Sequence, residues 1–170
     1  MARANCCLRP FADIVTPSDV AYRPTVSDGL DSMSEAPRSG SIELSWADLA
    51  ALQRCWEQVY LEVCGIPNPP DQYTAPDALM TINGNRFSVC RTTGEVMLEG
   101  VFELNATTSP KSITWIDAFG PDAGKRLPAS YQLERDSFMF IAADEGAPRP
   151  LVFRTGPGLT MRAFVRRFAR

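Results

Sequence analysis

Acid–base chemistry in this chain would have to come from carboxylates and tyrosines, because the sequence contains no histidine. That absence excludes Ser-His-Asp, Cys-His and histidine-based zinc sites. A buried Glu62 or Asp117 would have a raised pKa and could exchange protons, and Tyr60 or Tyr131 would donate a hydrogen bond to a developing oxyanion. If the protein is an enzyme, we therefore expect Glu62, Asp117 and Tyr131 to be catalytic, in a cofactor-independent cyclase or isomerase that holds a reactive substrate folded.

Other kinds of site have weaker patterns. No nucleophile stands beside a base, so the sequence gives no support to covalent catalysis. Residues 120–125 read Gly-Pro-Asp-Ala-Gly-Lys, which lacks the full Gly-x-x-x-x-Gly-Lys-Ser/Thr pattern and is interpreted as a turn. Asp117 and Asp122 could contribute to an oxygen-rich cation site, but they lack the spacing of an EF-hand loop. We expect no metal and no cofactor.

Charge and hydropathy narrow the partners and the location. A net charge of -3 argues against a nucleic-acid partner, because such affinity comes from clustered Lys and Arg. No segment approaches the roughly 18 apolar residues of a membrane span, and the first ten residues have no signal-peptide core. The five cysteines contain no Cys-x-x-Cys pair, and reduced thiols are their simplest account. We therefore expect a cytoplasmic protein without a membrane span; the oligomeric state is left open.

The candidate residues lie on segments whose apolar residues recur with period two. Residues 1–44 have loop composition and are interpreted as an irregular N-terminal extension to a single domain, 45–170. Ser45 is the expected N-cap of a short helix from Trp46 to about Leu52. Beyond that helix, alternating runs bounded by turn residues predict eight strands, near 53–63, 78–83, 86–92, 95–104, 112–119, 126–134, 137–143 and 159–168.

Turn chemistry indicates how these strands are joined. Asn83-Gly84 suits the positive φ angles of a tight hairpin, and Thr93-Gly94 follows at the spacing of the next one. Short links favour antiparallel pairing of successive strands, and eight such strands can close into a barrel that leaves no exposed edge. The sequence therefore predicts an all-β, antiparallel eight-stranded barrel.

Alternation also predicts which side chains face the interior. If Trp56 faces inward, the same parity brings Gln58, Tyr60 and Glu62 inward, with Arg91 and Asp117 on the inner side of their strands. The other expected inner residues are Phe87, Val89, Val96, Leu98, Phe102, Leu104, Ile113, Trp115, Phe119, Leu127, Ala129, Tyr131, Leu133, Phe138, Phe140, Met161, Ala163 and Val165.

Several stretches between about residues 51 and 167 resemble, in order, an uncharacterised bacterial family of lipocalin-like domains that occurs in many copies in planctomycetes. The resemblance implies a lipocalin-like antiparallel barrel, and it implies no established activity or catalytic residue. One departure is that such sequences usually place Gly two residues before the first-strand Trp, whereas this chain has Arg54; we expect the entry into that strand to differ. The matching stretches are Leu52-Gln53 with Trp56, Glu62 with Gly65 and Pro67, and residues 84–87, 100–104, 109–113, 120–125 and 131–133, with Arg149-Pro150 and Phe153.

The polar residues on the expected inner faces leave two interpretations open. They could lie near strand ends, where Arg91 would pair with Asp117 or Glu62 at the rim of a filled barrel. Alternatively, they could line a pocket with aromatic walls, a composition typical of small-molecule sites. In that case the expected ligand-binding residues are Trp56, Gln58, Tyr60, Phe87, Arg91, Phe102, Trp115 and Phe140.

Three functions follow from these interpretations. We favour non-covalent binding of a small, largely apolar molecule inside the barrel. The first alternative is the cyclase or isomerase described above. The second is an inhibitor or immunity-type interaction module with a filled barrel, which would bind a protein partner through its loops or residues 1–44.

Overall fold

The structure of the protein is a computed structural model, which describes residues 39–68 and 78–168. Expectations for residues 1–38, which form most of the N-terminal extension, lie outside this described part. In order, the elements are α1 (Ser39–Leu52), β1 (Arg54–Val63), β2 (Ile66–Pro67), β3 (Ala78–Asn83), β4 (Arg86–Arg91), β5 (Val96–Asn105), β6 (Lys111–Asp117), β7 (Arg126–Leu133), β8 (Ser137–Ala143) and β9 (Leu159–Arg166).

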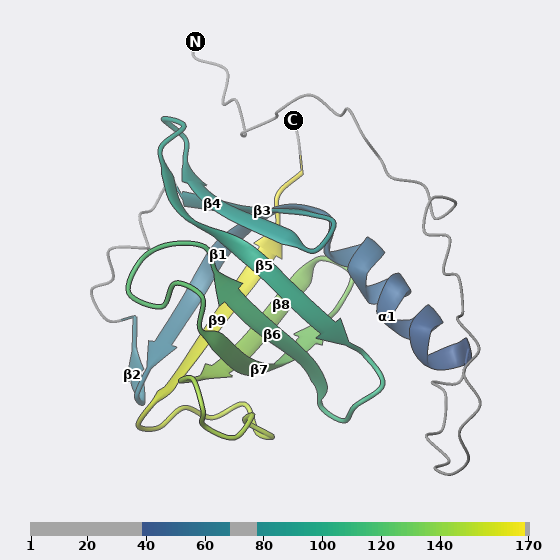
Figure 1. The fold of residues 1–170 in the computed structure, drawn as a ribbon. Coiled ribbons are helices and arrows are strands. Elements are labelled where there is room, and N and C mark those ends of the chain that lie inside the picture. The colour runs from purple at the N-terminus through teal and green to yellow at the C-terminus, as the bar shows by residue number, and fades with distance from the viewer. Residues whose placement is uncertain (1–38, 69–77, 169–170) are drawn as a thin grey trace, which may run out of the picture.

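Eight of these strands form a closed barrel (Figure 1). Each of β3 to β9 pairs antiparallel with its neighbour along the chain, and β1 pairs antiparallel with both β3 and β9. The β1–β9 pairing closes the sheet, while the two-residue β2 extends β1 outside the ring. The prediction of an all-β, antiparallel eight-stranded, lipocalin-like barrel is confirmed.

The helix before the barrel is longer than the sequence predicted. It begins at Ser39 rather than Trp46, so Ser45 lies inside it and the expected N-cap at Ser45 is wrong. The Ser45 hydroxyl instead accepts a hydrogen bond from the Ala106 amide, 3.1 Å away, in the turn after β5. Asp48, one turn later, accepts hydrogen bonds from Tyr131 Oη at 2.6 Å and Lys111 Nζ at 2.7 Å. These contacts hold α1 against one end of the barrel.

The same end is closed by the start of β1 and the end of β9. Trp56 is fully buried, and its indole N–H donates to the Leu52 carbonyl at 2.8 Å. The guanidinium of Arg166 lies 4.5 Å from the centre of the Trp56 ring and donates to the carbonyls of Ala51, Gln53 and Arg135. We refer to this part of the barrel, with the core around Phe102, Tyr131 and Phe138, as the closed half.

Arg54 enters β1 with a φ of +110°, a region that glycine adopts freely and L side chains rarely do. The backbone at this position is therefore glycine-like although the residue is arginine. The strand pairing on both sides holds this conformation, because Arg54 pairs with Ile82 and Trp56 pairs with both Met80 and Arg166. The expected difference from the usual entry of the resembled family stays a prediction.

Two irregularities change which side chains face inward. In β1 the register with β9 shifts between Gln58 and Tyr60, because Val59 is an extra, exposed residue. A bulge of this kind reverses the alternation beyond it, so the prediction that Tyr60 and Glu62 face inward is wrong. In β5 a similar shift opposite Val89 and Cys90 leaves Val96 exposed rather than inward.

The predicted inner face of β9 was also wrong. Thr160, Arg162 and Phe164 line the interior, whereas Met161 and Ala163 pair with Glu62 and Tyr60 on the outer face. Val165 shares their parity and is 39% exposed. The outer face of β9 is thus partly apolar, and this misled the assignment by hydropathy alone.

The remaining sequence expectations concern thiols and membranes. Cys64 and Cys90 are not disulfide-bonded, but Cys55 is, so the expectation of a fully reduced set is wrong at Cys55. In the described part of the chain, α1 is too short and too polar for a bilayer-spanning helix.

Candidate functional site

The half of the barrel opposite α1, which we call the open half, contains a cavity of about 300 Å³. It lies between strand ends that are distant in sequence: the starts of β3, β5, β7 and β9, and the ends of β4, β6 and β8. A volume of this size is at the lower end of the range for small-molecule sites. The barrel is therefore filled in one half and hollow in the other.

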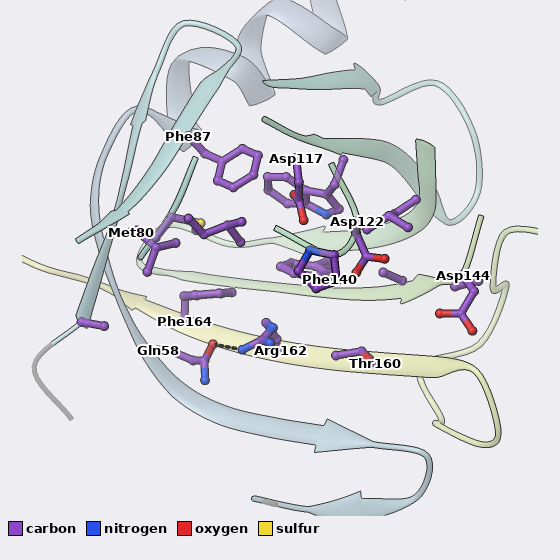
Figure 2. Close-up of a pocket in the computed structure, with 18 of the residues that line it drawn as sticks. Gln58, Met80, Phe87, Asp117, Asp122, Phe140, Asp144, Thr160, Arg162 and Phe164 are labelled. Atoms are coloured by element: carbon purple, nitrogen blue, oxygen red, sulfur yellow. Dashed lines mark hydrogen bonds between the residues drawn. The ribbon is translucent and has the colours of Figure 1, made fainter. Parts of the chain in front are cut away.

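The wall of the cavity is mainly apolar and partly aromatic (Figure 2). The ring of Trp115 lies 5.1 Å from that of Phe87, edge to face, and 4.9 Å from that of Phe140. Phe140 in turn stacks on Phe164 at 5.9 Å. The other apolar lining residues are Ala78, Met80, Val89, Leu98, Phe119, Pro121, Leu127, Ala142 and Ala143.

Gly100 lets this wall form. A Cβ atom at this position would lie 2.2 Å from the Ile116 carbonyl oxygen and 2.8 Å from the Phe87 ring. The absence of a side chain thus allows β5 to pass directly beneath Phe87 and brings that ring over the interior.

Polar side chains occupy two facing sides of the cavity. Figure 2 shows Asp117 and Asp122 on one side and the Gln58–Arg162 pair on the other, with Phe140 between them. Arg162 Nη1 donates to Gln58 Oε1 at 2.8 Å. Asp144 and Thr160 line the cavity near the ends of β8 and β9.

Asp117 is the carboxylate whose surroundings are most altered. Its pKa is raised to about 6: burial is the largest cause, the neighbouring charge of Asp122 acts in the same direction, and the charge of Arg162 opposes both. Its side chain has no hydrogen-bond partner among the described residues. The Asp122 carboxylate, by contrast, pairs with Lys125 Nζ at 2.9 Å.

The structure brings together five of the residues predicted for the site. Gln58, Phe87, Trp115 and Phe140, predicted to bind ligand, line the cavity together with Asp117, predicted to be catalytic. Trp56, Tyr60, Glu62, Arg91, Phe102 and Tyr131 do not line it.

Two of the three predicted catalytic residues therefore lie away from Asp117. Tyr131 donates its hydroxyl to Asp48 in the closed half, and burial together with this carboxylate raises its pKa. Glu62 lies on the outer face of β1, where hydrogen bonds from Thr155 and Tyr60 lower its pKa. The bond to Glu62 in turn raises the pKa of Tyr60. The bulge at Val59 is the physical reason for the outward position of Tyr60 and Glu62.

The remaining three predicted site residues contribute to packing or to an ion pair outside the cavity. Trp56 and Phe102 belong to the core of the closed half, where Phe102 packs 5.3 Å from Trp115. Arg91 shares the parity of Phe87 and Val89 but lies at the end of β4, with its Nε 3.2 Å from Glu95 Oε2. The expected pairing of Arg91 with Asp117 or Glu62 is wrong, because the tight turn after β4 places Glu95 closer.

Sequence reasoning missed Arg162 and Asp144, and it considered Asp122 only as a weak cation-site candidate and a turn residue. Arg162 alternates with Phe164 and Thr160, so choosing the other parity for β9 would have found it. Asp122 and Asp144 follow β6 and β8 in loops, where alternation gives no signal. In the described part of the chain, no group of three or more metal-ligating side chains is close enough to hold a metal ion.

The chain was compared with protein-family models, curated proteins and solved structures. No family model, curated protein or solved structure matches this chain.

Proposed function

We propose that the protein binds a small, largely apolar molecule non-covalently in the open half of its barrel. The observation that carries this proposal is the cavity of about 300 Å³, whose wall is mainly apolar and includes a few polar groups. The resemblance to the uncharacterised lipocalin-like family and the cytoplasmic location stay predictions.

An unpaired buried donor supports the same conclusion. Trp115 is 5% exposed, and its indole N–H has no acceptor in the described part of the chain. Leaving such a donor unpaired costs about 1–3 kcal/mol. Such exceptions are uncommon in native structures, and a polar group of a ligand in the cavity would supply the missing acceptor.

A fluorescent apolar probe tests the proposal. N-phenyl-1-naphthylamine should bind the full chain with a stoichiometry of one and a rise in probe fluorescence. Ala142 lines the cavity, so Ala142→Phe should fill part of it and lower probe affinity by roughly tenfold or more, which is about 1.4 kcal/mol. Ala51→Phe, which adds the same ring to an exposed position on α1, is the matched control and should leave binding unchanged.

Equal probe affinity in both variants would show that the probe binds elsewhere and would contradict the proposal. If the probe binds as expected, native mass spectrometry of protein purified from its own organism identifies the natural ligand.

A second candidate is a cyclase or isomerase, favoured only by Asp117. A carboxyl with a pKa of about 6 can donate and accept protons near neutral pH, and this one faces the cavity. Once a ligand is identified, Asp117→Asn should abolish its turnover while keeping its affinity if the protein is an enzyme. The third possibility, an interaction module, required a filled barrel and is not proposed.

A further inference from the structure

The described side chains around the cavity carry more negative than positive charge, and this imbalance bears on which class of ligand the cavity would bind. Among the described residues that line the cavity, three are carboxylates, Asp117, Asp122 and Asp144, and one is a cation, Arg162. Arg162 already donates to Gln58 on its own side of the cavity. Asp122 is paired with Lys125, so the carboxylates of Asp117 and Asp144 are the two with no hydrogen-bond partner among the described residues. Of these, Asp117 lies on the same side of the cavity as Asp122 (Figure 2).

We infer that the cavity selects a protonated primary amine with an apolar body, with the ammonium group on the Asp117 side and the apolar body against the aromatic wall. This inference rests on the proposed function and specifies its ligand.

Geometry and chemistry both support a cation at this position. In Figure 2 the carboxylates of Asp117 and Asp122 lie on the same side of the cavity, so one ammonium group can offset the repulsion between them. The rings of Trp115 and Phe140 form part of the adjacent wall, and aromatic faces attract cations at short range. An ammonium group has three N–H donors. It therefore suits the Asp117 carboxylate, which accepts no hydrogen bond from the described residues.

The same arrangement predicts a pH dependence. The charged groups that act on Asp117 are Asp122, in the loop after β6, and Arg162, on β9, while Asp144, after β8, lines the same cavity. With a pKa of about 6, Asp117 is mostly ionised at pH 7.5 and mostly protonated at pH 5. An alkylamine stays protonated over this range, so its affinity should fall roughly tenfold between these pH values.

Three probes with the same eight-carbon chain test the inference: octylamine, octanol and octanoate, each titrated calorimetrically into the full chain. At pH 7.5 we expect octylamine to bind at least tenfold more tightly than octanol, and octanoate more weakly than octanol. Asp117→Asn should remove the advantage of octylamine and leave octanol binding unchanged, which also shows that the variant is folded. Glu99→Gln removes the same charge from an exposed position on β5 and is the matched control.

The outcomes separate this inference from the proposed function. If octanol binds and octylamine binds no more tightly, the amine inference is overturned while the binding function stands. If octanoate binds most tightly and Arg162→Gln removes its advantage, the cavity selects anions and the inference is overturned. If none of the three binds, both the inference and the proposed function are overturned.

Discussion

The two halves of the barrel are built from the same eight strands but differ in what their inner side chains contact. In the closed half, Trp56, Phe102 and Phe138 are at most 1% exposed and pack under α1. In the open half, the inner residues Leu98 and Leu127 are only partly buried and border the cavity.

We therefore expect the closed half to contribute most of the stability of the barrel and the open half to bind the ligand. In a tightly packed core the loss of even one methylene group lowers the stability of the protein. Residues beside an existing cavity have fewer contacts to lose, so their truncation costs less. The polar groups differ in the same way: Asp48, Tyr131 and Lys111 satisfy one another in the closed half, whereas Asp117 in the open half has no hydrogen-bond partner among the described residues.

Truncating one inner residue in each half should give the largest contrast. Phe102→Ala should lower the free energy of unfolding by about 4 kcal/mol, because it removes a fully buried ring from the closed half. Leu98→Ala should cost only about 1 kcal/mol, because its side chain already borders the cavity. Urea denaturation of both variants measures these values, and equal losses would break the proposed division of the barrel.

A smaller effect is expected from the hydroxyl of Tyr131. Tyr131→Phe removes its hydrogen bond to the Asp48 carboxylate and should cost about 2 kcal/mol of unfolding free energy. Tyr60→Phe removes a similar bond to Glu62 on the outer face and should cost less, since water can replace it there. Binding of N-phenyl-1-naphthylamine should be unchanged in Tyr131→Phe, and a loss of probe affinity without a loss of stability would instead place Tyr131 in the binding site.

The smallest expected effect is a gain in stability at the entry to the closed half. Arg54→Gly should raise the free energy of unfolding by about 1 kcal/mol relative to Arg54→Ala, because only glycine adopts a φ of +110° without strain. Thermal unfolding of the two variants tests this. If the alanine variant were as stable as the glycine variant, the positive φ would impose no measurable strain.

The aromatic core and most of the aromatic part of the cavity wall were predictable from the sequence. Alternation placed Phe87, Trp115 and Phe140 on inner faces, and all three line the cavity, because a two-residue period sorts side chains reliably along an unbroken strand. The same rule failed at Tyr60 and Glu62, beyond the bulge at Val59. A bulge depends on the register that both neighbouring strands impose, and a single strand's sequence does not contain that information.

The sequence by itself determined the eight strands, their antiparallel order and the closure of the sheet, because periodicity and turn chemistry are local properties of the chain. Only the tertiary structure decided that one half of the barrel is filled and the other hollow. It also decided that Asp117, Asp122 and Arg162 surround one cavity. These features depend on contacts between residues up to about a hundred positions apart, such as Gln58 with Arg162, and on how far α1 reaches over one end.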